Sequence, residues 1–392
     1  MKRSTRLSNI PPYHFARWAK HINAVRQQGV DVIRLDVGNP DMPPPDEIVE
    51  ALCGAARKYD RHGYPGYGGI PPLREAIVAY YEKRFGVSLD VGSQVMPLLG
   101  SKEGITHLAL ACLDPGDVVL VPDPCYAPYT MGTMLAEAEV YTFPLLAEND
   151  FLPDLDAIPV DVLDKAVLLW LNYPNNPTGA TAALEFLAQA VEFARQNDLL
   201  LCHDAPYADV TYDGYVAPSV MQVEGATDVA VEFNSLSKTY NMAGWRVGTA
   251  VGNAETLAAL AQLKSNVDTG MFCPVQEAAV RALSISPAWI AERNEIYRER
   301  LDILVEGLAE TSMSTARPPA TLYIWARVPD AWESSEQFAR ALLEQAGVAI
   351  ASGSYFGPAG EGYVRISATA PTEQVRKAAE RLGQFLKSSG LH

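Results

Sequence analysis

Residues 166–204, AVLLWLNYPNNPTGATAALEFLAQAVEFARQNDLLLCHD, contain the pattern that decides the fold. Two apolar runs, 166–172 and 199–203, flank a segment at 184–197 in which apolar residues recur with helical spacing. Near-continuous apolar runs separated by a helix are typical of strands in a parallel sheet that is covered on both faces. The stretch therefore predicts a strand–helix–strand unit of an α/β protein.

The same pattern continues on both sides of this unit. Residues 116–122 (GDVVLVP) and 228–233 (DVAVEF) are further strand-like runs. Polar clusters follow directly on the four runs, at 123–126, 172–179, 204–207 and 235–238. Ligands bind at the carboxyl ends of the strands in such sheets, so we expect these clusters to share one ligand-binding edge.

Two less regular regions flank this core. The segment before it carries the proline-rich run PDMPPP at 40–45, and after 286 the pattern alternates between helices and strands. The helices are expected at 286–308, 335–346 and 372–386, and the strands at 322–328 and 362–367. We predict an α/β fold in which a large domain, 46–285, holds a mostly parallel sheet sandwiched by helices. A small α+β domain would be built from both chain ends, 1–45 and 286–392.

Composition and charge exclude several classes of protein. The 392 residues are 48% hydrophobic and carry a formal net charge of −16, so we expect a folded chain and no nucleic-acid partner. The five cysteines are scattered and never in CxxC spacing, which argues against a zinc or other metal site and favours a reducing, cytoplasmic location. The sequence shows neither a signal peptide nor about 18 uninterrupted apolar residues, so no membrane span is expected.

Lys238 is the first candidate for covalent chemistry. It ends the sequence Ser235-Leu236-Ser237-Lys238, directly after a predicted strand. A lysine at a ligand edge can form a Schiff base with a carbonyl, and the two serines and Arg246 could bind a phosphate dianion beside it. A solvated surface lysine after a strand would give the same local pattern.

Asp204 and Tyr207 lie at the end of the run 199–203. A buried carboxylate could hold a ring nitrogen in its protonated state, and a tyrosine three residues later could bond a phenolate-type oxygen. An Asx turn with a packed tyrosine is the alternative. The segment 172–179, NYPNNPTG, combines a Tyr-Pro and an Asn-Pro unit into a stiff turn at the same edge, which a plain surface loop does not require.

Three further positions could bind a ligand. Gly100-Ser101-Lys102-Glu103-Gly104 precedes an apolar helical run, and the free N–H groups at the start of a helix can hold phosphate. Tyr126 could stack on an aromatic ring. Arg365 lies in an otherwise apolar strand and could clamp a carboxylate. The respective alternatives are an ordinary helix start, a core tyrosine and a structural ion pair.

Together these clusters resemble the aminotransferase class I/II family of pyridoxal-phosphate (PLP) enzymes. The matching segments follow the family's order over nearly the whole chain, from about residue 36 to 367. They are VGNPD (37–41), YPGYGGIPPLREAI (64–77), GSKEG (100–104), DPCYAPY (123–129), NYPNNPTG (172–179), HDAPYADV (203–210), SLSKTYNMAGWRVG (235–248) and YVRIS (363–367). The resemblance implies the aspartate aminotransferase fold, fold type I, with a mostly parallel sheet of the seven-stranded type.

By this resemblance Lys238 is the catalytic residue, which carries PLP as a Schiff base and then moves the substrate's Cα proton. Asp204 is implied to pair with the ring nitrogen of PLP, which keeps the ring an electron sink. Tyr207 and Asn176 are implied to bond the ring phenolate, and Tyr126 to stack on the ring.

The resemblance also implies how the ends of the two ligands are held. Arg365 would clamp the substrate α-carboxylate, with help from Asn176 and the backbone of Gly38. The family is dimeric, so a homodimer is expected. The implied phosphate-binding residues are Ser101, Lys102, Ser235, Ser237 and Arg246, with Tyr64 reaching in from a neighbouring subunit.

Within the family, the extended segments are most similar to LL-diaminopimelate aminotransferases. These enzymes exchange an amino group between tetrahydrodipicolinate and glutamate in lysine biosynthesis, by a ping-pong mechanism. An aminotransferase for aspartate, alanine or aromatic amino acids is the alternative, and a second, distal arginine could come from Arg17, Arg26 or Arg34. The cofactor residues also leave a PLP-dependent lyase or decarboxylase open.

Two non-transaminase classes are disfavoured. A ligand-sensing regulator on this fold would carry a DNA-binding region, and only about 35 residues precede the first matching segment. A nicotinamide enzyme would carry GxGxxG after a strand, and the sequence has none.

Overall fold

A seven-stranded sheet forms the centre of the part of the chain that the computed structural model describes, residues 4–309, 311–313 and 315–388. Strand β8 is antiparallel to both of its neighbours, and every other adjacent pair is parallel. This arrangement confirms the predicted α/β class with a mostly parallel sheet. Across the sheet the order is β2 (Val95–Leu98), β8 (Gly248–Gly252), β7 (Ala230–Ser235), β6 (Leu200–Asp204), β5 (Ala166–Leu171), β3 (Val118–Asp123) and β4 (Glu139–Pro144).

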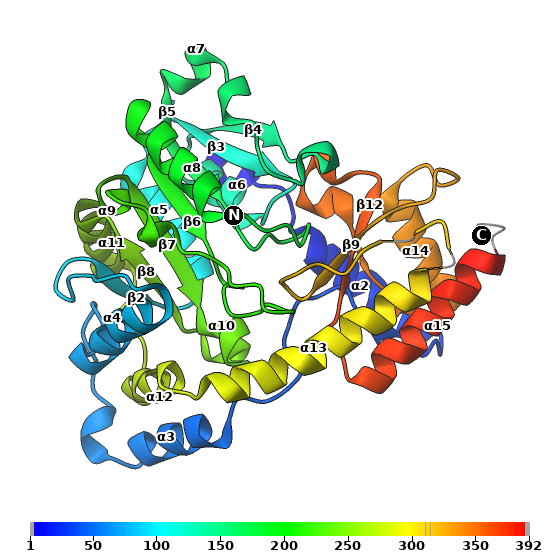
Figure 1. Ribbon diagram of the computed structural model, residues 1–392, viewed down its shortest axis with the longest axis horizontal. Helices are drawn as coiled ribbons and strands as arrows, with labels where there is room; N and C mark the ends of the chain where they lie inside the picture. The colour runs from blue at the N-terminus through cyan, green and yellow to red at the C-terminus, as the bar shows by residue number, and fades with distance from the viewer. Residues whose placement is uncertain (1–3, 310, 314, 389–392) are drawn as a thin grey trace.

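Side chains alternate between the two faces of this sheet. In β5, Leu169 and Leu171 join one core, and Leu168 and Trp170 join the core on the opposite face. Helices cover both faces, as the near-continuous apolar strands require (Figure 1). The first face packs against α4 (Pro71–Phe85), α8 (Leu184–Gln196) and α12 (Cys273–Leu283), and the second against α5 (Ser101–Cys112), α6 (Pro128–Leu135) and α11 (Ala254–Val267).

The four predicted strands of the sheet are present, with shifted ends. The largest shift is at 228–233, where the strand begins only at Ala230. Residues 226–229 form a short helix, α9 (Ala226–Val229), because Gly225 adopts a left-handed conformation (φ 72°) and starts a helical turn. Ser235 ends strand β7, and the next residues form the short helix α10 (Leu236–Thr239), which carries Lys238. Elsewhere α3 (Asp46–Ala56) packs on α12, and α7 (Val160–Leu163) precedes β5.

A separate core joins the two ends of the chain. Trp18, Ile22 and Val25 of α2 are buried there among residues from 297 onward. The first three elements are α1 (Thr5–Asn9), α2 (His14–Gln27) and β1 (Ile33–Arg34), which pairs in parallel with β10 (Val348–Ala349). An antiparallel sheet contains β11 (Ala351–Ser352), β12 (Tyr363–Ser367) and β9 (Tyr323–Arg327), beside α14 (Ser335–Ala346) and α15 (Thr372–Ser388). The predicted boundaries 45/46 and 285/286 stay a prediction.

The long helix α13 (Pro287–Leu308) runs from α12 to α15 (Figure 1). Near its start Trp289 and Ile290 pack against the core of the large sheet. In its second half Leu301 and Leu304 belong to the core formed by the chain ends. One helix therefore contributes side chains to both cores. No helix within the described ranges is both long enough and apolar enough to cross a membrane.

The buried carboxylate of Glu232, in β7, forms hydrogen bonds with several elements next to the sheet. It accepts hydrogen bonds from Tyr81 Oη (2.9 Å), from Ser219 Oγ (2.8 Å) and from the backbone N–H of Val220 (2.9 Å). His203 Nδ1 of β6 lies 2.9 Å from Oε2 of the same carboxylate. Both Glu232 and His203 are fully buried. The carboxylate therefore satisfies donors from α4, from β6 and from the loop at 219–220.

We expect Glu232→Ala to lower the free energy of unfolding by about 3–5 kcal/mol, because it leaves several buried donors without an acceptor. Urea denaturation followed by circular dichroism measures the change. Glu295→Ala is the matched control, since Glu295 is exposed and pairs with Arg298 on the surface of α13. If the two variants unfold at the same urea concentration, the buried network does not stabilise the sheet.

Candidate active site

A cavity of about 320 Å³ opens at the carboxyl edge of the large sheet. It lies where the ends of β5, β6 and β7 meet residues of β9 and β12, so both cores contribute to its walls. With the exception of Tyr64, all the predicted site residues line it. They are Gly38, Ser101, Lys102, Tyr126, Asn176, Asp204, Tyr207, Ser235, Ser237, Lys238, Arg246 and Arg365.

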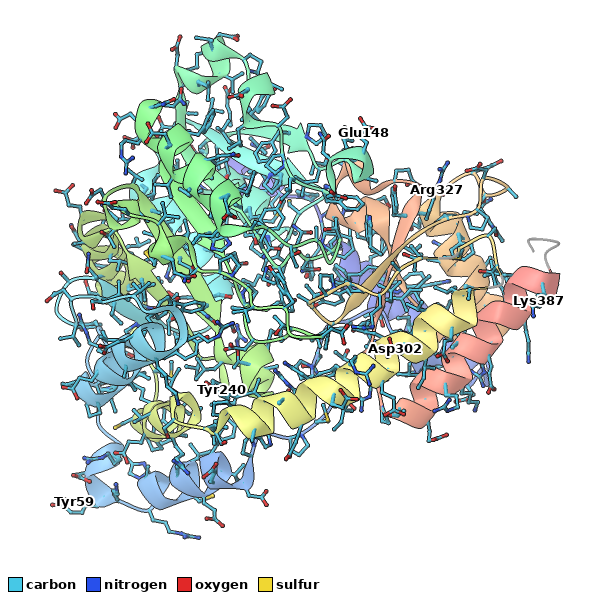
Figure 2. All side chains as sticks on the ribbon, viewed as in Figure 1. Tyr59, Glu148, Tyr240, Asp302, Arg327 and Lys387 are labelled. Carbon is cyan, nitrogen blue, oxygen red and sulfur yellow. The ribbon has the colours of Figure 1, made fainter. Side chains whose placement is uncertain are left out.

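Tyr64 lies outside the cavity and its side chain is 89% exposed. Tyr59, five residues earlier in the chain, is 96% exposed and projects from the molecule beside α3 (Figure 2). The predicted role of Tyr64 requires a neighbouring subunit, so it stays a prediction.

Asp204 ends strand β6 at the floor of the cavity and is 2% exposed. Its Oδ2 accepts a hydrogen bond from Tyr129 Oη at 2.7 Å, whereas its Oδ1 has no partner among the described residues. Burial raises the pKa of this carboxyl group to about 6, against the opposing effect of Tyr129. Asp204 therefore presents one unsatisfied acceptor in a low-dielectric site.

The turn at 172–179 is buried, so the surface-loop interpretation is wrong. Asn172 Nδ2 donates to the backbone carbonyl of Asp204 at 2.6 Å, and Asn172 Oδ1 accepts from the N–H of Asn176 at 2.8 Å. Asn175 Oδ1 accepts from both the N–H and the hydroxyl of Thr178. The asparagines thus fix the turn internally and place the side chain of Asn176 in the cavity.

Lys238 extends from α10 into the cavity, and its Nζ donates to the carbonyl oxygen of Gly38. Burial lowers the pKa of its ammonium group, and the nearby cations Arg365 and Arg246 lower it further, against the opposing effect of Tyr323. A lysine with a lowered pKa is a better nucleophile and base at neutral pH. The plain surface-lysine interpretation is therefore wrong.

The guanidinium of Arg246 lies beside the start of α5. Its Nη1 is 3.5 Å from Ser237 Oγ, and a Cβ added at Gly100 would lie 2.1 Å from its Nη2. Gly100, with φ 84°, therefore allows the guanidinium to approach the helix start closely. Ser101 begins this helix, and Ser235 and Ser237 line the same cavity. Hydroxyls, a helix N-terminus and a fixed cation together suit a phosphate.

Lys102 differs from Ser235 and Ser237 in its exposure to solvent. It is exposed, and its Nζ lies over the ring of Tyr13, 5.1 Å from the ring centroid. Tyr126 also lines the cavity and contacts Tyr129 edge to face. Burial raises the pKa of the Tyr126 hydroxyl, so this residue is neutral at physiological pH.

Arg365 of β12 is a buried cation, 4% exposed, that forms no ion pair with an acidic residue in the described part of the chain. Its Nη1 donates to Asn176 Oδ1 at 2.6 Å and its Nη2 to the carbonyl of Asp36 at 2.8 Å. Its Nε lacks any partner within the described residues. Since the structural ion pair is not found, the guanidinium is available for an anionic ligand.

Aromatic rings that the motif analysis missed surround this guanidinium. Its Cζ lies 4.2 Å from the ring centroid of Tyr323, 4.6 Å from that of Phe356 and 5.7 Å from that of Phe15. The hydroxyls of Tyr323 and Tyr207 are 2.7 Å apart. These rings come from segments far apart in the chain, and no local pattern marks them as ligand contacts.

The three arginines considered as a distal carboxylate reader lie outside the cavity lining. Arg17 is 63% exposed near Glu336, and Arg26 donates to the carbonyl of Val32. Arg34 pairs with Asp36 at 2.8 Å. None of these three arginines therefore contributes a side chain to the cavity lining.

One acidic cluster lies apart from the cavity. Glu103, His107 and Asp268 converge closely enough to bind a metal ion. The buried amine of Lys264 donates to Glu103 at 2.8 Å and to Asp268 at 2.9 Å. This ammonium already pairs with both carboxylates, and His107 Nδ1 lies 2.5 Å from Glu103 Oε1, which is the behaviour of a structural ion-pair network between α5 and α11.

Comparison with known proteins assigns this architecture to a family. Residues 30–382 match the family model for aminotransferase class I and II. The chain is 49% identical to an LL-diaminopimelate aminotransferase from Dehalococcoides mccartyi, over 98% of this chain and 99% of that protein. Its fold is similar to that of substrate-bound BacF from Bacillus subtilis (TM-score 0.94, 37% identity, 98% of each chain). It is also similar to a mutant aspartate aminotransferase from Thermus thermophilus (TM-score 0.92, 30% identity, 98% and 100% of the two chains). The chain belongs to the aminotransferase class I and II family.

Proposed function

We propose that this aminotransferase uses PLP bound in the cavity and that its amino acid substrate is LL-diaminopimelate. The single observation that carries the cofactor proposal is the free Oδ1 of Asp204, a buried acceptor for which the described residues supply no donor. A protonated ring nitrogen would supply that donor and a compensating charge. The opposite end of the cavity, with Arg246 and the start of α5, suits a phosphate.

The remaining contacts of the cofactor follow from this orientation. Tyr126 would stack on the ring, and Tyr207 and Asn176 would bond its phenolate oxygen. Lys238, whose amine lies in the same cavity, would form the covalent link. The proposed phosphate ligands are Ser101, Lys102, Ser235, Ser237 and Arg246.

When bound, PLP supplies an electron sink for charge that develops on the substrate's α-carbon. The chain's own residues then have separate tasks. The Lys238 amine, with its lowered pKa, would accept the proton from the substrate's Cα and, as an ammonium group, would donate that proton to the cofactor carbon. Arg365 fixes the α-carboxylate with its fork, and Asn176 and the backbone of Gly38 complete that end of the site. Arg365 is nearly dry, so its hydrogen bonds to an anion are stronger than they would be in water.

Two relatives support LL-diaminopimelate as the substrate. A relative 49% identical over nearly the whole chain carries the name LL-diaminopimelate aminotransferase, as does a 48% identical relative from Moorella thermoacetica. We propose exchange of the amino group between glutamate and tetrahydrodipicolinate by a ping-pong mechanism, in lysine biosynthesis.

We further propose a homodimer in which Tyr64 contacts the cofactor phosphate of the neighbouring subunit. The exposure of Tyr64, Tyr59 and Phe272 supports an interface that includes these residues, since large exposed apolar patches mark protein contacts. The five cysteines are free thiols, which supports the cytoplasm as the compartment.

Absorption spectroscopy with one amino donor at a time tests the substrate. We expect LL-diaminopimelate and glutamate to remove the band of the aldehyde-form cofactor as the amine form accumulates. Aspartate, alanine and phenylalanine should leave the band unchanged. A response to any of these three without a response to LL-diaminopimelate would show that the substrate is wrongly assigned.

Lys238→Ala should reduce transamination at least about 100-fold, the lower range for a positioned proton-transfer group. The variant should still bind PLP, but borohydride reduction and mass spectrometry should find no covalent adduct. Lys83→Ala, at an exposed lysine of α4, is the control and should retain both properties. Normal turnover by Lys238→Ala would exclude the proposed chemistry.

Arg365→Lys keeps the positive charge but loses the fork, so we expect a loss in kcat/KM of about 10- to 100-fold for every amino acid substrate alike. This corresponds to about 1.5–3 kcal/mol for a hydrogen bond to a charged group. Steady-state kinetics with LL-diaminopimelate and glutamate measures it. A loss confined to one donor would place Arg365 at the substrate's side chain instead.

A further inference from the structure

Arg293 of α13 is a second buried cation, 3% exposed, and it is not part of the cavity lining. Its Nη1 donates to the backbone carbonyl of Lys238. Its Nη2 donates to the backbone carbonyl of Asp209 at 2.9 Å and to Asn294 Oδ1 at 2.7 Å. All of its acceptors are neutral, and no carboxylate in the described ranges forms an ion pair with it.

The two carbonyls belong to different segments of the active site. Lys238 lies in the last turn of α10, where carbonyl groups have no partner inside the helix. Asp209 follows Tyr207 by two residues, in the loop after β6. One planar guanidinium therefore bridges the carbonyl groups of Lys238 and Asp209, the latter two residues after Tyr207. A lysine amine cannot reproduce this geometry.

We propose that Arg293 is a positioning residue that sets where the Lys238 amine lies relative to Tyr207. The inference rests on the proposed function, in which both side chains act on one cofactor. Arg293 does not line the cavity and touches neither cofactor nor substrate. It acts through the backbone of the segment that carries the nucleophile.

The energetics favour a positioning role over mere packing. Removing a guanidinium from water costs several kcal/mol, and an apolar side chain of similar volume would fill the same space without that cost. Here burial lowers the pKa of Arg293, and its Nε has no partner in the described part of the chain. Beside its cation–π contacts with Trp289 and Tyr297, the guanidinium adds directed hydrogen bonds that join Lys238 to Asp209.

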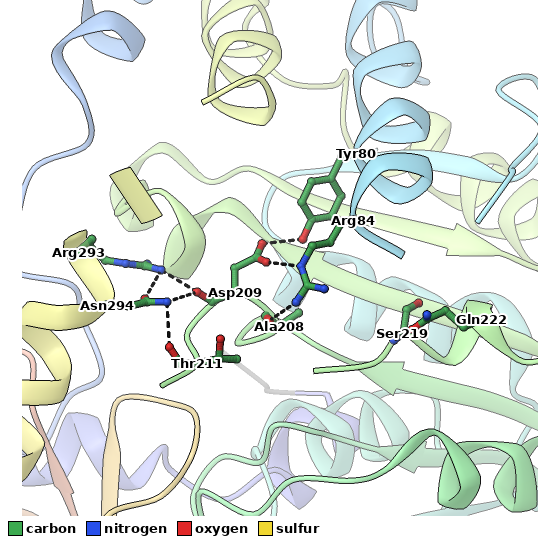
Figure 3. Close-up of polar contacts among 9 residues, drawn as sticks. All are labelled: Tyr80, Arg84, Ala208, Asp209, Thr211, Ser219, Gln222, Arg293 and Asn294. Atoms are coloured by element: carbon green, nitrogen blue, oxygen red, sulfur yellow. Dashed lines mark hydrogen bonds and ion pairs between the residues drawn. The ribbon is translucent and has the colours of Figure 1, made fainter. Parts of the chain in front are cut away.

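The loop residue Asp209 is held independently from the opposite side. Its carboxylate accepts from Tyr80 Oη at 2.7 Å and from Arg84 Nε at 2.9 Å, both on α4. Figure 3 shows these two side chains on one side of Asp209, with Arg293 and Asn294 approaching its main chain from the other. The two side chains of α4 thus hold Asp209 in place, and Arg293 links the main chain of Asp209 to the main chain of Lys238.

This arrangement provides a matched control. Arg84 contacts the same loop, through Asp209 and the carbonyl of Ala208, but it makes no contact with Lys238. Loss of Arg84 removes an ion pair and a hydrogen bond from this loop, while Tyr80 still donates to the Asp209 carboxylate and holds it against α4. A general structural effect should therefore appear in both variants, and a positioning effect only in Arg293 variants.

A groove of about 360 Å³ gives solvent access to this position. It is lined by Arg293 together with Asn241, Trp289 and Pro43. Small cations can enter such a groove, so guanidinium added to Arg293→Ala can occupy the space that the side chain leaves. Ammonium, a compact point charge, cannot bridge the two carbonyls.

The experiment compares Arg293→Ala, Arg293→Lys and Arg84→Ala in the full-length protein. The first readout is the rate at which PLP becomes covalently attached to Lys238 in cofactor-free protein, followed by timed borohydride reduction and mass spectrometry. The second is the pH titration of the absorption band of the bound cofactor. The third is kcat and KM for the amino donor, alongside the melting temperature.

We expect both Arg293 variants to attach PLP more slowly and to lose about tenfold to hundredfold in kcat, the effect of a small misplacement of a reacting group. KM should change little, and the pH titration of the band should shift. Low millimolar guanidinium should restore the attachment rate of Arg293→Ala, and ammonium should not. Arg84→Ala should lose thermal stability without these changes.

Wild-type attachment rates and an unshifted titration in Arg293→Lys would overturn the proposal, even if Arg293→Ala does not fold. So would equal effects in the Arg84 and Arg293 variants. If wild-type protein itself attaches no PLP at Lys238, the proposed function fails instead, so the two failures are distinguishable.

Discussion

The direction of the strands in the large sheet is the constraint on which the active site depends. Strands β5, β6 and β7 are parallel neighbours, so their carboxyl ends meet at one edge. Asn172 follows the first of them, and Asp204 and Ser235 end the other two. Helices cover both faces of the sheet, which leaves this edge as the place where polar side chains can gather. The hydrogen bond from Asn172 to the backbone of Asp204 then locks two strand ends together.

The opposite wall of the cavity comes from the core built by the chain ends, and its charge complements that of the sheet edge. Asp204 offers a buried acceptor and Arg365 a buried donor, and neither atom is satisfied by another described residue. Such groups normally destabilise a folded protein by about 1–3 kcal/mol each. Their retention in the lining of one cavity is typical of a site whose ligand completes the hydrogen bonding. This arrangement supports the proposed ligands, which would bring a cationic donor to Asp204 and a carboxylate to Arg365.

Much of this arrangement follows from the sequence, because strand runs, stiff turns and the spacing of motifs are local properties. The helix at 335–346 and the polar turn at 172–179 are examples. Contacts between distant segments leave no such local trace. Strand β8, GTAVG, is too short and rich in glycine to show a pattern, and β2 contains a proline. Tyr323 reads as an ordinary core residue of a strand, although its ring covers Arg365. Arg293 lies among charged neighbours in a helix, which suggests a solvated face, yet the fold buries it.

The core that joins the two chain ends also has a consequence for biosynthesis. Trp18, Ile22 and Val25 are made early, but they pack among residues from 297 onward. At about 5–20 residues per second, the roughly 270 intervening residues take about 15–50 s to synthesise. The residues of the large sheet and its helices emerge within that time and can pack against one another. During this time the apolar side of α2 lacks most of the residues that bury it in the folded protein. An incomplete chain with exposed apolar side chains is prone to aggregate and to bind chaperones. Helix α2 thus leaves the ribosome well before most of the residues that bury its apolar side are made.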